Sequence, residues 1–139
     1  MGPSVVLDTN VLVSAMRWRG IPSEVLQLVL EKSLTLLSCR QQLDELRRVL
    51  GYAKLEVLPE DKDNFLATVE SLAVIVNIEG ELRCIEEDPS DDVLLELALK
   101  GGAICIVSGD HHLLQLHTFE GIPIKTPLEF MTEFRQNVV

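Results

Sequence analysis

Short runs of consecutive apolar residues recur along the chain, and most are rich in β-branched side chains. Such runs are typical of strands buried on both faces, as in a parallel sheet. They predict five strands, at residues 4–7, 34–37, 74–78, 103–107 and 122–125. Amphipathic segments separate the runs, so strands are expected to alternate with helices.

Helix-end signals accompany these segments. A short helix is expected at 11–15, followed by a loop at 17–22 that contains glycine and proline. The other predicted helices cover residues 23–32, 38–51, 59–73 and 91–100, with a short one after Asp110 and a last one after Thr126. Ser38 with Gln41, and Thr126 with Glu129, have the spacing of capping boxes.

Alternating strands and helices imply parallel crossovers with helices on both faces of the sheet. We therefore predict an α/β fold with a central, mostly parallel twisted sheet, in a single domain over residues 1–139. Ligands bind such sheets beyond the carboxyl ends of the strands, near a switch in strand order. Residues that directly follow a strand are therefore the first candidates for a functional site.

Composition narrows the class of protein. Apolar residues make up 47% of the chain, which excludes a disordered protein, and no apolar run reaches the roughly 18 residues of a membrane span. With no basic signal peptide, we expect a soluble, cytoplasmic protein without membrane contact. Cys39, Cys84 and Cys105 lack paired spacing and predict reduced thiols.

The net charge of −10 argues against a broad basic face for nucleic acid. It is compatible with a carboxylate-lined metal site or with a basic partner.

Two predicted strands are followed at once by acidic and small polar residues, in Asp8-Thr9-Asn10 and Ser108-Gly109-Asp110. Either Asp alone could be a helix cap or a turn former. Two of them at matching ends of parallel strands would share one edge of the sheet. Glu45 falls roughly 40° outside the apolar stripe of its helix, where it could be solvated or reach a cleft at that edge.

Asp91 and Asp92 open the helix before the fourth strand, at the end of Asp88-Pro89-Ser90-Asp91-Asp92. The helix dipole alone favours acids there. Packed near Asp8 and Asp110, however, they would repel one another unless a cation offset the charge. Mg²⁺ and Mn²⁺ prefer oxygen ligands, so the cluster suits metal-assisted hydrolysis of a phosphodiester.

These motifs, in this order, resemble the PIN domain family, and the likeness runs from Val5 to about Met131. Its landmarks are Val6-Leu7-Asp8-Thr9-Asn10-Val11-Leu12, Glu45-Leu46 with Val49-Leu50, Asp88-Pro89-Ser90-Asp91-Asp92 with Ala98, and Val107-Ser108-Gly109-Asp110 with Leu113-Leu114. Each motif is weak alone, but the ordered set is specific. It is most similar to the small prokaryotic PIN proteins grouped with VapC-like toxins of toxin–antitoxin systems.

The resemblance implies a PIN-like three-layer sandwich and a Mg²⁺- or Mn²⁺-dependent endoribonuclease. It carries the family's acidic residues onto Asp8, Glu45, Asp91 and Asp110. Asp92 is a reserve metal ligand, and Asn10 and Ser108 would orient carboxylates or water. The resemblance also implies a homodimer and, for a toxin, an antitoxin whose segment covers the acidic cleft.

Residues outside the acidic set leave alternatives open. In Arg17-Trp18-Arg19, the Trp could stack on an RNA base while the Arg side chains contact phosphate, or it could pack on the domain or on a second subunit. His111-His112 stands where the family more often has a basic or acidic residue. The pair could bind a softer metal or phosphate, or could simply be exposed at a helix start.

Two other functions compete with the nuclease. The first is a non-catalytic PIN-like binding or scaffold module, against which the retention of all four acids argues. The second is a Mg²⁺-dependent phosphohydrolase of small substrates with an Asp nucleophile. Asp8-Thr9-Asn10 lacks the second Asp, two residues on, that such enzymes commonly have.

Overall fold

The sheet of the computed structural model has the order β3-β2-β1-β4-β6-β5 within the described residues, 2–82 and 89–137. The strands are β1 Ser4–Leu7, β2 Thr35–Ser38, β3 Val74–Ile75, β4 Cys105–Val107, β5 Thr118–Phe119 and β6 Ile122–Lys125. Every neighbouring pair is parallel except β5 and β6. The predicted α/β class with a mostly parallel sheet is confirmed.

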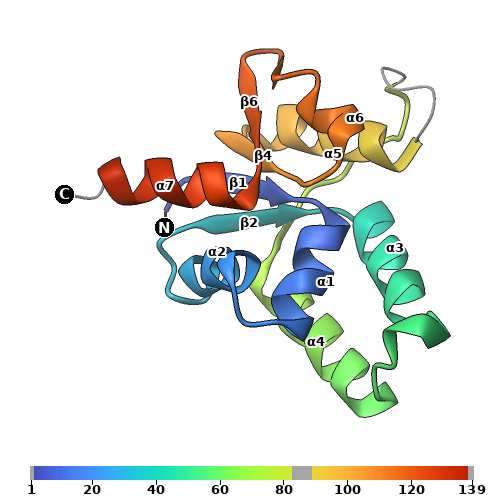
Figure 1. Cartoon of the computed structure of the whole chain (residues 1–139). Helices are drawn as coiled ribbons and strands as arrows, with labels where there is room; N and C mark the ends of the chain where they lie inside the picture. The colour runs from blue at the N-terminus through green and yellow to red at the C-terminus, as the bar shows by residue number, and fades with distance from the viewer. Residues whose placement is uncertain (1, 83–88, 138–139) are drawn as a thin grey trace.

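Helices cover both faces of this sheet (Figure 1). They are α1 Thr9–Arg17, α2 Ile21–Leu30, α3 Arg40–Leu50, α4 Pro59–Leu72, α5 Pro89–Gly101, α6 His111–Leu114 and α7 Pro127–Asn137, with a 3₁₀ turn at Ala53–Leu55. Figure 1 shows α5 and α6 on one face and α1, α2 and α4 on the other. The result is three layers, with the sheet in the middle.

The central strand β1 explains why its sequence is apolar without alternation. Val5 and Leu7 pack in the core formed with α1, α2, α4 and α7, whereas Val6 packs in the core formed with α5. Successive side chains of a strand point to opposite faces, and both faces are covered here. All three side chains are fully buried.

The residues at which α1 and α2 begin differ from the positions predicted from the sequence. Helix α1 begins at Thr9, directly after the strand, and runs to Arg17 instead of covering only 11–15. Helix α2 begins at Ile21 rather than Ser23, because the Ser23 hydroxyl accepts the Gly20 N–H from inside the first turn.

The capping box predicted at Ser38 and Gln41 is wrong. Helix α3 begins at Arg40, after Cys39, and the Ser38 hydroxyl donates to Gln42 instead. The Thr126–Glu129 box is confirmed, with hydrogen bonds in both directions.

The remaining differences concern short elements. Strand β3 has two residues rather than the predicted five, β4 begins at Cys105 rather than at residue 103, and the two-residue strand β5 was not predicted. Helix α5 begins at Pro89, two residues before the predicted start, and Gly102 follows its end with a positive φ of 70°. The segment 79–90 reads as a polar loop in the sequence, and half of it, residues 83–88 with Asp88 among them, lies outside the described residues.

Two of the three cysteines are buried free thiols. Burial raises the pKa of Cys39, and it raises the pKa of Cys105 to about 12. Both are therefore inert core residues in the folded chain, while Cys84 lies outside the described residues. No helix in the described part of the chain is both long and apolar enough to cross a bilayer.

Candidate active site

Strands β1 and β4 end side by side at the switch in strand order. Leu7 pairs with Val107, and the Asp8 N–H donates to the Val107 carbonyl at 2.9 Å. From β1 the sheet continues to β2 and β3 on one side and to β4 on the other. The residues after β1 and β4 therefore meet where ligands bind parallel sheets.

A hollow of about 180 Å³ lies at this point. It is lined by Asp8, Thr9, Asn10, Glu45, Val49, Ser90, Asp91, Leu94 and Asp110. The structure thus brings together the four acidic residues singled out in the sequence, from the ends of β1 and β4, the middle of α3 and the first turn of α5. Asp92 is not among the lining residues, although its side chain is also buried.

Asp8 is held from both sides. The fully buried Ser108 donates its hydroxyl to Asp8 Oδ2 at 2.7 Å, and the Asn10 N–H donates to Asp8 Oδ1 at 3.3 Å. The Ser108 hydroxyl in turn accepts the Asp110 N–H at 2.9 Å. Ser108 therefore connects the Asp8 carboxylate to the backbone of Asp110 and fixes the orientation of Asp8. The Asn10 side chain is exposed at the rim.

The hollow is electrostatically unfavourable for Asp8. Burial, the largest cause, raises the pKa of Asp8, and repulsion from Glu45 and Asp110 raises it further, against the hydrogen bonds from Ser108 and Asn10. No Lys, Arg or His stands among the lining residues in the described part of the chain. A cation would relieve this repulsion.

The donor atoms suit a hard cation. Carboxylate, amide and hydroxyl oxygens surround the hollow, and oxygen donors are what Mg²⁺ and Mn²⁺ prefer. The buried Thr9 hydroxyl, also in the lining, has no hydrogen-bond partner within the described residues. The residues present therefore fit a divalent metal ion.

Comparison with known proteins identifies the family of this chain. The PIN domain family matches residues 4–112, a range that includes every acid of the hollow. The chain belongs to the PIN domain family. No curated protein matches this PIN domain. The fold is similar to a solved structure described as VapBC2 from Rickettsia felis bound to a DNA fragment from their promoter, with a TM-score of 0.64. The two chains are 19% identical, and the aligned region covers 88% of this chain and 98% of the other. At this identity the likeness concerns the fold alone, and it agrees with the predicted PIN-like sandwich.

The sequence analysis missed Gln42, which positions α3 in this PIN domain. Gln42 is 1% exposed, and its Nε2 donates to the Leu7 carbonyl at 2.6 Å while its Oε1 accepts the Ser38 hydroxyl at 2.6 Å. These bonds connect α3 to the ends of β1 and β2, one helical turn before Glu45. The spacing in the sequence could have revealed its burial, because Gln42 stands four residues before the apolar Leu46 and therefore lies on the same, core-facing side of the helix.

Glu96 was missed as well. Its buried carboxylate accepts the backbone N–H groups of Glu79, Gly80 and Leu82 at 3.0–3.2 Å. Burial alone would raise the pKa of Glu96, but these N–H groups outweigh it and lower the pKa. Glu96 thus holds residues 79–82 against α5, the helix that carries Asp91.

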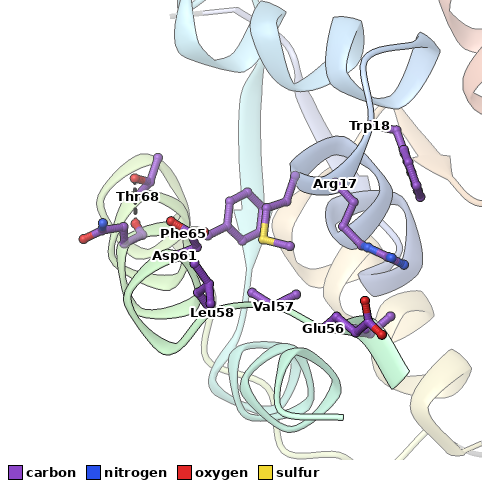
Figure 2. Close-up of a pocket in the computed structure, with 11 residues that line it drawn as sticks. Arg17, Trp18, Glu56, Val57, Leu58, Asp61, Phe65 and Thr68 are labelled. Atoms are coloured by element: carbon purple, nitrogen blue, oxygen red, sulfur yellow. Dashed lines mark hydrogen bonds between the residues drawn. The ribbon is translucent and has the colours of Figure 1, made fainter. Parts of the chain in front are cut away.

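Arg17 and Trp18 line a second and larger hollow, of about 670 Å³, between the end of α1 and α4. Figure 2 shows Phe65 pointing from α4 toward the end of α1. The Arg17 guanidinium lies 5.0 Å from the centre of the Trp18 ring, whereas Arg19 lines a different hollow. The structure therefore brings together two residues of the proposed RNA-binding triplet and separates the third. Helix α1, with nine residues, is about 13 Å long, and residues at its two ends line this hollow and the acidic one.

The basic residues of α3 do not line the acidic hollow. Arg40 and Arg47 lie around another hollow, where Arg47 faces Asp44 at 3.8 Å and Glu70 at 3.6 Å. These side chains are more than half exposed or nearly so, and such pairs contribute little to stability.

Proposed function

We propose that this PIN domain is a metal-dependent endoribonuclease that hydrolyses RNA phosphodiester bonds. The observation that carries the proposal is the gathering of Asp8, Glu45, Asp91 and Asp110 around one hollow at the switch point of the sheet. Among the described residues, Glu45 and Asp110 repel the buried Asp8 carboxylate and raise its pKa. Such an arrangement is costly unless it binds a cation.

The four acids would hold Mg²⁺ or Mn²⁺, with Asp92 as a reserve ligand. When bound, the ion lowers the pKa of a water molecule and stabilises the charge that develops on the phosphate. Ser108 keeps the Asp8 carboxylate oriented toward the hollow, and Asn10 is available at the rim to orient substrate or water. Val49 and Leu94 supply the apolar part of the wall.

An unpaired RNA strand is the favoured substrate. A small hollow at the edge of a sheet admits a flexible single strand more easily than a duplex. Arg17 and Trp18, about one helix length away, could contact a phosphate and stack on a base elsewhere along the same strand. With a net charge of −10, binding would depend on the metal ion and on these few cationic side chains.

We also propose an antitoxin partner and a homodimer. The similar structure of VapBC2 supports the first at the level of the fold. A basic antitoxin segment would be attracted to the acidic hollow, which it would cover. For the homodimer, the exposed Trp18 and the adjacent Ile21 and α4 offer apolar surface.

A cleavage assay with a fluorescently labelled single-stranded RNA tests the activity. The parent should cleave with Mg²⁺ or Mn²⁺ and stop in EDTA. Asp8→Asn should cleave roughly 100-fold more slowly or worse, the scale of losing a charge contact to the transition state. Asp63→Asn, which changes an exposed acid on α4, should equal the parent.

Circular dichroism of each variant separates chemistry from folding. If Asp8→Asn is folded and cleaves as fast as the parent, the nuclease site lies elsewhere. If it unfolds, Asp8 is structural, and Glu45→Gln then tests the site from a half-buried position. A parent that cleaves no RNA with either metal, yet binds a partner, would favour the scaffold module. Turnover of a small phosphate ester instead of RNA would favour the phosphohydrolase.

A further inference from the structure

Two histidines follow Asp110 at the start of α6, and their rings lie beside its carboxylate. The potential ligand atoms of Asp110, His111 and His112 all lie within 4.8 Å of one another. His112 Nδ1 is 3.5 Å from Asp110 Oδ1, and the centres of the two imidazole rings are 4.1 Å apart. His111 is exposed and the other two are half-buried, so an ion from solvent can reach all three.

We propose that Asp110, His111 and His112 bind a transition-metal ion such as Zn²⁺, at a site that shares Asp110 with the acidic hollow and adds two imidazole nitrogens to it. Imidazole nitrogen favours Zn²⁺ over Mg²⁺, which prefers oxygen. In a tetrahedral site with bonds of about 2.0–2.1 Å, two ligand atoms lie about 3.3 Å apart. The 3.5 Å between His112 and Asp110 is already close to that separation.

The arrangement of the two histidines supports the same ion. Consecutive residues of a helix normally point about 100° apart and do not face each other. Here the rings are neighbours, tilted by 37°, at the first two positions of the four-residue helix α6. The Asp110 carboxylate is fixed independently, because its Oδ1 accepts the His112 N–H at 2.8 Å. Three protein ligands leave one position of a tetrahedral ion for water.

Asp110 belongs to both sites, since it also lines the acidic hollow. An ion bound to the histidines would also bind the Asp110 carboxylate, which is then less available to a metal ion in the hollow. Its positive charge would also repel a second cation nearby. Zn²⁺ at the histidines therefore inhibits Mg²⁺-dependent cleavage. This regulatory step rests on the proposed nuclease function, whereas Zn²⁺ binding itself does not.

Calorimetric titration of the full chain with Zn²⁺, without Mg²⁺ so that no other ion competes for Asp110, tests binding directly. The parent should bind one Zn²⁺, and the His111→Ala/His112→Ala double variant should bind it at least about tenfold more weakly. His117→Ala, which removes the remaining histidine of the chain, is the matched control and should bind like the parent. A folded double variant that binds Zn²⁺ like the parent overturns the site.

The cleavage assay, repeated with added Zn²⁺, tests the regulatory step. Zn²⁺ should slow the parent and the His117→Ala control, but not the double variant, which should keep its Mg²⁺-dependent activity. Equal inhibition of the double variant, or activation of the parent, overturns the competition for Asp110. If the parent binds Zn²⁺ through the histidines but cleaves no RNA, only the nuclease proposal fails. If it cleaves RNA but binds no Zn²⁺, only the present inference fails.

Discussion

Replacing Gln42 by leucine tests how the fold holds Glu45 near Asp8. Gln42 is buried and makes two hydrogen bonds of 2.6 Å, to the Leu7 carbonyl and from the Ser38 hydroxyl. Leucine fills nearly the same space but has no polar atom, so both bonds are lost where water cannot replace them. A buried polar group left without its partner costs about 1–3 kcal/mol.

The two lost bonds together predict a cost of about 2–6 kcal/mol. The more apolar leucine side chain returns roughly 1–2 kcal/mol through its burial. We therefore expect the free energy of unfolding to fall by about 1–4 kcal/mol, within the range of broken buried networks. For a chain of this size that lowers Tm by about 3–20 °C.

Urea unfolding followed by circular dichroism measures the loss. Ser38→Ala in the Gln42→Leu background should cost less than it does in the parent, because the Ser38 hydroxyl has already lost its partner, with a coupling of about 0.5–3 kcal/mol. Gln115→Leu, at an exposed position, is the control. The variant should also bind Mn²⁺ more weakly, since α3 carries Glu45 one turn later. A Gln42→Leu protein within about 0.5 kcal/mol of the parent would refute this reasoning, because that is the effect of an ordinary surface change.

Two further predictions concern pH. In EDTA at pH 7, Asp8→Asn should be as stable as the parent or more so, because burial raises the pKa of Asp8 and the folded chain disfavours its charged form. The stability of the parent should fall as pH rises from about 4 through that raised pKa. Thermal melts of Asp8→Asn over the same pH range should lack this decrease in stability. A variant that melts far below the parent would make Asp8 structural. Glu96→Gln should behave oppositely, because the pKa of Glu96 is lowered and its carboxylate stabilises the fold above about pH 4.3. Urea titrations should find this variant about 1–3 kcal/mol less stable at neutral pH, with the difference lost as pH falls through the folded pKa. Equal stability at neutral pH would show that the negative charge of Glu96 contributes nothing to the fold.

The sequence by itself determined the class of fold. Strands β1 and β6 have their predicted bounds. For β1 the reason is that a strand covered on both faces is apolar at every buried position, whereas β6 buries only Ile122 and Ile124. The Thr126–Glu129 box was also predictable, because its partners stand three residues apart and need nothing from the rest of the chain. The strand-end acids were local signals too: in a parallel sheet, Asp8 and Asp110 must share one edge.

Short elements and competing hydrogen bonds were decided by packing. The two-residue strands β3 and β5 contain too few residues for a pattern and exist only through pairing with β2 and β6. Ser38 has the spacing of a cap with Gln41, but in the folded chain it bonds to the buried Gln42 instead. The local rule failed because a partner inside the core was available.

The family resemblance favoured Asp91 over Asp92, but only the tertiary structure places Asp91 among the residues that line the hollow. Adjacent residues of a helix point about 100° apart, and which of them faces β1 depends on how α5 packs on the sheet. The part played by Gln42 is equally invisible in the sequence. Its bond to the Leu7 carbonyl spans 35 residues, so it forms only once β1 and α3 are packed together.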